Sequence, residues 1–113
     1  MVYFTQAQEI QLEDHPKYPG VRIAILIKAS DGQGVSVSVL EIAPGVEVPI
    51  HTHPDQADSI YITSGRGRAY FNGDWHEVGQ GDHILAPKGE EHGLKNDGDI
   101  PMRLFVVHCP PLF

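Results

Sequence analysis

Glycine and proline interrupt this chain so often that it has little room for long regular elements. Its 113 residues include 12 glycines and 9 prolines at fairly even intervals, well above the roughly 12% of an average protein. The runs between them are β-branched, aromatic or alternating in polarity, and they are too short for amphipathic helices. We therefore expect almost no helix, and strands at 21–28, 35–43, 59–64, 67–72, 76–79, 83–87 and 102–108.

Turn signals between these runs favour an all-β fold. Asn72 and Gly73 follow an aromatic run, which is typical of a tight hairpin. The glycines of 30–34 and the Asn-Asp-Gly-Asp of 96–99 mark two further turns. Several short strands at this spacing predict a β-sandwich or barrel. A chain of 113 residues is expected to form a single domain over residues 1–113.

Charge and composition argue against several classes of partner. Fifteen acidic and eight basic residues give a net charge of −7, which repels nucleic acid and anionic lipid surfaces. No apolar run approaches the ~20 residues that span a bilayer, and residues 1–14 lack the features of a signal peptide. The single cysteine, Cys109, fits a reducing compartment. We expect a cytoplasmic protein with no nucleic acid or membrane partner.

Residues 45–65 hold the first indication of a site. His51 and His53 are one residue apart on a predicted strand, where side chains at i and i+2 lie on the same face. Two imidazoles directed at one point can grip a divalent metal. After the turn at 54–56, Asp58 is expected on the neighbouring antiparallel strand, where cross-strand Cβ atoms lie about 4.5–5.5 Å apart. The alternative is a pair of surface histidines that only titrate.

A second segment, residues 81–96, supports the metal interpretation. It predicts a buried strand, a turn at 87–89, and then His92 at the head of another strand. Together the two segments resemble the paired motifs of the cupin superfamily. The first motif is matched by Gly45, His51, His53 and Gly65, with Asp58 where the family usually has Glu. The second motif is matched at every position, by Gly81, Pro87, Gly89, His92 and Asn96.

This resemblance implies a fold, a cofactor and an assembly. The implied fold is a cupin-type jelly-roll barrel, or double-stranded β-helix, with one divalent transition metal inside. The implied ligands are His51, His53 and His92, with Asp58 as the candidate fourth. Imidazole sites accept Fe, Mn, Ni, Co, Cu or Zn, so the metal is left open. The resemblance also implies a homodimer in which residues 1–34 supply N-terminal strands to the interface.

The run 35–43 adds its own indication of a covered outer face. Val35, Val37 and Val39 alternate with Ser36 and Ser38, so the two sets of side chains lie on opposite faces of a strand. If the serines face the cavity, the valines face outward and need cover. Either a second subunit or the chain's own N-terminal strand can provide that cover.

Asp58 departs from the family pattern and leaves two ligand arrangements open. Its side chain is one methylene shorter than Glu, so its carboxylate falls about 1.5 Å short unless the backbone lies closer. Asp58 then either coordinates directly or acts on a metal-bound water or a histidine from outside the ligand set. The second arrangement leaves a coordination position open and makes Asp58 a candidate catalytic residue.

The other histidines are expected outside the metal site. His15 and His76 are predicted to lie at the surface, and His83 is predicted to face inward as a hydrogen-bonded structural residue. His108 lies two residues beyond Val106 on the last predicted strand, so it is predicted to border the cavity mouth. We take His108 as a second candidate catalytic residue.

The predicted cavity beside the metal is mostly apolar. Its expected inward side chains, besides Asp58, are Ile60, Ile62, Leu40, Ile42, Leu104 and Val106. Such walls favour a small apolar, enolic or diketone-type substrate. The resemblance therefore implies a metal-dependent enzyme, foremost a dioxygenase-like oxidoreductase. A metal-dependent isomerase or lyase is one alternative, and a non-catalytic cupin that binds or senses a metal or small ligand is the other.

Overall fold

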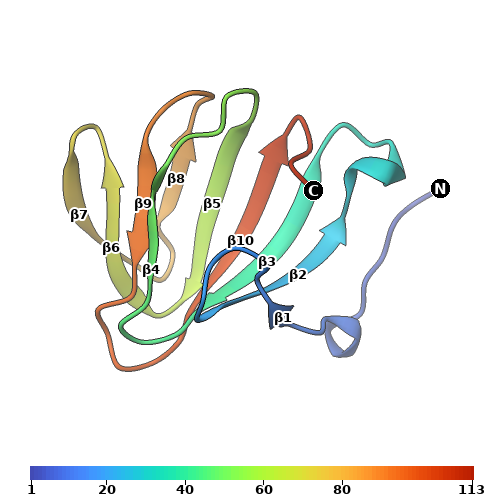
Figure 1. Cartoon of the computed structure of the whole chain (residues 1–113). Coiled ribbons are helices and arrows are strands. Elements are labelled where there is room, and N and C mark those ends of the chain that lie inside the picture. Colours follow the sequence, from blue (N-terminus) through green and yellow to red (C-terminus); the bar gives the residue numbers. More distant parts are fainter.

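The computed structural model describes residues 1–113 as a nearly all-β protein (Figure 1). Two 3-10 turns, η1 (Ala7–Glu9) and η2 (Ala29–Asp31), are its only helical segments, and no helix is long and apolar enough to cross a membrane. All seven strands predicted above are present. The ten strands are β1 (Glu13–Asp14), β2 (Val21–Ile27), β3 (Ser36–Ile42), β4 (Glu47–His51), β5 (Ala57–Ser64), β6 (Arg66–Phe71), β7 (Asp74–Gly79), β8 (His83–Ala86), β9 (His92–Lys95) and β10 (Met102–Cys109).

The strands form two sheets. The larger sheet has the order β1-β2-β3-β10-β5-β8, the smaller has the order β4-β9-β6-β7, and every pairing is antiparallel. From β3 onward the chain passes from one sheet to the other at every connection except the β6–β7 hairpin. This path is the double-stranded β-helix expected from the sequence. The turn between β6 and β7 is the predicted hairpin, with positive φ at Asn72 and Gly73.

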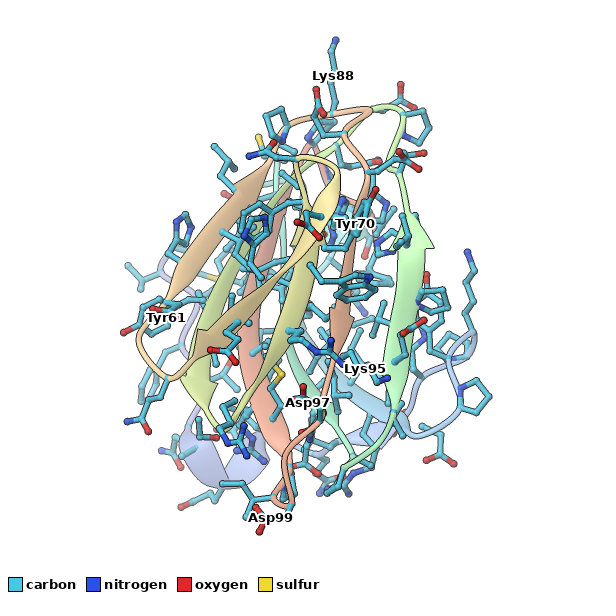
Figure 2. The ribbon with its side chains drawn as sticks, turned by 90° about the vertical axis from the view of Figure 1, so that its left-hand side faces the viewer. Tyr61, Tyr70, Lys88, Lys95, Asp97 and Asp99 are labelled. Carbon is cyan, nitrogen blue, oxygen red and sulfur yellow. The ribbon has the colours of Figure 1, made fainter.

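Apolar side chains fill one end of the space between the sheets, and polar ones occupy the other. Along β10, burial alternates, so that Met102, Leu104, Val106 and His108 point inward. The core consists of Val21, Ile42, Val48, Ile60, Ile62, Ala69, Leu94, Met102, Leu104 and Val106. Lys88 and Asp99 mark the two ends of the barrel in Figure 2. Apart from Asn96, the buried polar residues lie toward the Lys88 end. The β4–β5 and β8–β9 connections meet there, since the Gly89 amide donates to the His53 carbonyl at 2.8 Å.

The outer face of the larger sheet carries an apolar patch. On β3, Ser36 and Ser38 are buried while Val37 and Val39 are partly exposed, which confirms the alternation expected from the sequence. Val39, Phe105 and Tyr61 lie side by side in one row across β3, β10 and β5. Val37, Val107, Ser59 and Leu85 form the next row. Tyr61 projects away from the barrel in Figure 2.

Asn96 stabilises the loop between β9 and β10. It is 0% exposed, and its amide nitrogen donates to the carbonyls of Ile42 at 2.9 Å and Ile100 at 2.8 Å. Its amide oxygen accepts from the Gly98 N–H at 3.0 Å. One side chain therefore satisfies three backbone groups, which explains an amide at this point of the second motif.

Replacing Asn96 with alanine is expected to lower the free energy of unfolding by about 3 kcal/mol, because it leaves buried backbone groups without partners. Asp99→Ala is the matched control, since Asp99 is exposed in the same loop and a surface change of this kind costs less than about 0.5 kcal/mol. Urea titration of both variants measures the difference. Equal stability of the two variants would contradict this role for Asn96.

Candidate metal centre

Four side chains converge at the Lys88 end of the barrel. One donor atom from each of His51, His53, Asp58 and His92 can be chosen so that all four atoms lie within 4.8 Å of one another. Donors bound to one metal at about 2.1 Å are separated by roughly 3–4 Å. The four residues predicted as ligands therefore form one group of the right size for a single ion.

His51 and His92 come together through the pairing of β4 with β9. The two residues are register partners after an irregularity that follows Val48, and their ring centroids lie 4.3 Å apart. His53 lies just beyond the end of β4, so the expectation that it shares a strand with His51 is wrong. The strand ends early because Pro54 and the bends at 54–55 start the turn. The His53 ring still lies 4.8 Å from His51 and 5.2 Å from His92.

Asp58 approaches this group from the opposite sheet. The sequence placed it on the strand next to His51 and His53, but β5 belongs to the larger sheet and β4 to the smaller one. The chain crosses between sheets at 52–56, so the carboxylate faces the imidazoles across the barrel. Asp58 Oδ2 lies 3.0 Å from His92 Nε2 and 3.5 Å from His53 Nε2. This approach across the barrel compensates for the shorter side chain.

Hydrogen bonds to the main chain orient two of the imidazoles. His51 Nδ1 lies 2.7 Å from the Pro49 carbonyl, and His92 Nδ1 lies 2.9 Å from the Glu90 carbonyl. A carbonyl only accepts, so each Nδ1 carries the proton and each Nε2 is directed at the centre. Such bonds fix the tautomer and the ring orientation of metal-binding histidines.

His108 is the fifth polar side chain of the centre. It is the register partner of Asp58 on β10, and its Nε2 lies 3.4 Å from Asp58 Oδ2. The ring is buried, and Nδ1 has no hydrogen-bond partner. The structure thus places the candidate catalytic residues Asp58 and His108 side by side.

The electrostatics of the centre reflect one carboxylate among several imidazoles. Burial alone raises the pKa of Asp58, but hydrogen bonds from His108, His53 and His92 outweigh it and hold that pKa far below its usual range. Burial lowers the pKa of His92, but the Asp58 carboxylate and the Glu90 carbonyl outweigh it and raise that pKa. The carboxylate is therefore ionised near neutral pH and attracts positive charge to this point.

Comparison with known proteins identifies the family. The family model described as the cupin domain matches residues 38–108 of the sequence. This range includes every residue of the centre. The chain belongs to the cupin family. Protein SchB of Streptomyces halstedii is 28% identical over 111 residues, which are 95% of this chain and 80% of SchB. An uncharacterized protein of Methanocaldococcus jannaschii is 32% identical over 81 residues, which are 70% of this chain and 65%, just under two thirds, of that protein.

Solved structures agree with this assignment. The polyketide cyclase RemF from Streptomyces resistomycificus superposes on this cupin with a TM-score of 0.82 and 25% identity, over 96% of this chain and 80% of RemF. A predicted oxalate decarboxylase from Thermotoga maritima gives a TM-score of 0.84 at 24% identity, over 97% and 99% of the two chains. The second likeness shows the fold alone.

The residues of this cupin fit a divalent transition metal. Nitrogen and carboxylate donors are those that such ions prefer. Asp58 Oδ2 faces the imidazoles, and Oδ1 is buried without a hydrogen-bond partner, so the carboxylate keeps an unused acceptor.

A cavity of about 350 Å³ opens from the metal centre. It confirms the apolar walls predicted from Leu40, Ile60, Leu104 and Val106, whereas Ile42 and Ile62 lie in the core instead. The further apolar lining residues are Tyr18, Val48, Leu94, Leu112 and Phe113. Predominantly apolar walls with a few convergent polar groups are typical of small-molecule sites.

Two histidines lie elsewhere than expected. His15, predicted at the surface, is partly buried and lines the cavity. His83, predicted to face inward, is exposed on the outer face beside Ser59, 2.8 Å from its hydroxyl. In β8, Ala86 is buried and Ile84 packs on the core, so His83 and Leu85 face outward. The run Ile-Leu-Ala is apolar throughout, so the sequence does not show which of its residues face inward.

The sequence also missed the residues that close the cavity mouth. Tyr18 lies in a loop after β1, and Phe113 lies beyond β10, where neither motif nor strand pattern gives a position. Phe113 is held by its carbonyl, which accepts from the Ala29 N–H at 2.6 Å. Its ring lies 5.8 Å from His108 and 6.5 Å from His15. The sequence gives one weak signal for these residues. His15 and Tyr18 stand in a polar segment, and Phe113 follows a proline-rich one.

Proposed function

We propose that this cupin is a metal-dependent enzyme that cleaves a small enolic or 1,3-diketone compound with dioxygen. The observation that supports this is the position of three imidazoles and a carboxylate at the inner end of an apolar cavity of about 350 Å³. A divalent transition metal held there by His51, His53, Asp58 and His92 would supply Lewis acidity and, where it is redox-active, dioxygen chemistry. The apolar walls exclude water and favour a neutral, compact substrate.

The protein's own contribution is binding and proton transfer. His108 lines the cavity and its Nδ1 has no hydrogen-bond partner, which makes it the candidate base for the acidic proton of a diketone. Asp58 lies beside His108 and stabilises the resulting imidazolium. Cleavage of one carbon–carbon bond by one dioxygen molecule then gives a carboxylic acid and an α-ketoaldehyde, which together contain both oxygen atoms.

A non-oxidative reaction is the second candidate. The 25% identity to a polyketide cyclase over 96% of the chain favours it, and so does the free nitrogen of His108, since enolate formation by a base needs no oxidant. An isomerase, lyase or cyclase would use the same centre as a Lewis acid. A cupin that only binds a metal or small ligand would use it without turnover.

Incubation with pentane-2,4-dione distinguishes these functions. Protein loaded in turn with Fe, Mn, Co, Ni, Cu or Zn is mixed with the diketone in air and under nitrogen. We expect one equivalent of dioxygen consumed per diketone lost, with no loss under nitrogen. Equal loss under nitrogen would support the non-oxidative reaction. Binding without loss in either gas would support the non-catalytic function.

We also propose that the protein is a homodimer joined through the outer face of the larger sheet. Phe105, Tyr61 and Leu85 are 40%, 45% and 58% exposed on that face, next to Val37 and Val39. A patch of this kind is costly to leave in water. A second copy covers it symmetrically.

Light scattering at micromolar concentration is expected to give twice the 12.4 kDa mass of one chain. Phe105→Asp should reduce the mass to that of one chain, because it buries a charge in the interface. Glu77→Gln is a suitable control, since Glu77 is exposed on β7 of the smaller sheet. A wild-type mass of one chain would exclude the dimer.

A further inference from the structure

The loop after β1 covers the cavity mouth and brings a histidine that neither motif includes. His15 to Tyr18 all line the cavity that leads to the metal centre. In Figure 1 this loop crosses in front of β2 and β3. The loop is closed at both ends, because the His15 N–H donates to the Val21 carbonyl at 2.8 Å and the Val21 N–H donates to the Tyr18 carbonyl at 3.2 Å. It therefore holds His15 in a defined position.

Hydrogen bonds within the loop fix the tautomer of His15. The N–H groups of Lys17 and Tyr18 donate to His15 Nδ1 at 3.0 and 3.3 Å. Nδ1 must therefore be unprotonated, and the ring proton is on Nε2. Burial and the nearby Lys17 lower the pKa of His15, which keeps the ring neutral. Nε2–H is the one polar group that the ring can offer to a molecule in the cavity.

The polar side chains at this outer end include no carboxylate. Besides His15, the rim carries Lys17, whose ammonium lies 5.5 Å from the centre of the Tyr18 ring. Asp58 is the sole carboxylate among the lining side chains, and it belongs to the inner end. A neutral N–H donor next to an ammonium is complementary to an anionic oxygen.

One aromatic ring separates the two polar ends of the cavity. The Tyr18 ring lies 4.8 Å from the His15 ring and 6.2 Å from the His51 ring. A molecule that extends from the metal centre past the Tyr18 ring therefore comes next to His15. The apolar walls between the ends offer no other polar partner for that part of the molecule.

We propose that His15 binds a carboxylate on the tail of the substrate, so that the substrate is an enolic dicarbonyl acid whose carboxylate lies at the end away from the metal centre. This inference rests on the proposed function for the identity of the dicarbonyl head. The carboxylate contact itself is independent of turnover.

Calorimetry with two matched diketones tests the inference. In 4,6-dioxoheptanoate a carboxylate replaces the terminal methyl group of heptane-2,4-dione. Zinc-loaded protein is used, because zinc has no redox chemistry and so prevents oxidative turnover. We expect the wild-type protein to bind the dioxoheptanoate about tenfold more tightly than the heptanedione, as one hydrogen bond to a charged group provides.

His15→Asn removes the donor while keeping the loop. The Asn Oδ1 can take the place of Nδ1 and accept from Lys17 and Tyr18, but the short amide does not reach the cavity. The preference should fall to within about twofold in this variant. His83→Asn is the control, since His83 lies on the outer face, and it should keep the tenfold preference.

Three results would overturn the inference. The first is a wild-type protein that binds neither diketone, or binds both equally. The second is a preference for the carboxylate that is retained in His15→Asn. The third is a preference that is lost only in Lys17→Met, which would assign carboxylate binding to the ammonium alone. Metal-free protein is expected to bind both diketones more weakly with the same ratio. Unchanged affinity in metal-free protein would instead count against the metal-dependent function and leave the role of His15 intact.

Discussion

Replacing His92 with alanine is expected to weaken divalent metal binding by more than about 100-fold, beyond the roughly 10–100-fold typical of groups outside the ligand set. His92 is buried between His51 and Asp58, and its Nδ1 bond to the Glu90 carbonyl directs Nε2 at the centre. Equilibrium titration with zinc against a competing chelator measures the change.

The matched control for this experiment is His83→Ala. His83 is exposed on the outer face of the larger sheet, so its loss should leave the zinc affinity within about twofold of wild type, as for an ordinary surface substitution. The circular dichroism of both variants shows whether the fold is retained. Full zinc affinity in a folded His92→Ala protein would show that the ligand set is wrong.

The second large effect is expected at Asp58. Oδ2 lies 3.0 Å from His92 Nε2 and 3.5 Å from His53 Nε2, which are close to the separations of donors that share one ion at about 2.1 Å. Asp58→Ala should therefore weaken zinc binding by at least about 100-fold, more than loss of an outer group would. Diketone turnover should be lost as well.

Two variants distinguish direct coordination by Asp58 from a role outside the ligand set. They are Asp58→Ala and Asp58→Glu, each measured for zinc affinity and turnover. If Asp58→Ala keeps nearly all of its zinc affinity while turnover falls about 10–100-fold, the carboxylate acts on a bound water or a histidine instead of on the metal. In that case Asp58→Glu would bind zinc more tightly and turn over more slowly, because the longer side chain fills the open position. Titration and turnover are measured on the same preparations.

The sequence predicted the fold and most of the centre because local signals were strong. Frequent glycines and prolines delimited the strands, and Asn72-Gly73 marked the hairpin between β6 and β7. His51 and His92 stood at fixed points of two spaced motifs, and pairing of β4 with β9 brings them together. The strands, the hairpin and the His51–His92 pair were predictable because each depends on residues that are close in sequence or that lie in one pair of strands.

Features that depend on the path between the sheets could not be predicted. The position of Asp58 opposite the imidazoles follows from the crossing between β4 and β5, which alternation along a strand does not encode. His15 and Phe113 reach the cavity mouth through loops held by main-chain hydrogen bonds, so no periodicity marks them. Burial of His108 beside Asp58 required the register of β10 against β5.

The metal centre is tested most directly by X-ray absorption spectroscopy on protein loaded with one equivalent of zinc. We expect a shell of nitrogen and oxygen donors at about 2.0–2.1 Å, with the multiple-scattering pattern of three imidazoles from His51, His53 and His92. Loss of one imidazole from that pattern in His92→Ala would complete the assignment. A shell made only of water and carboxylate oxygens in the wild-type protein would contradict it.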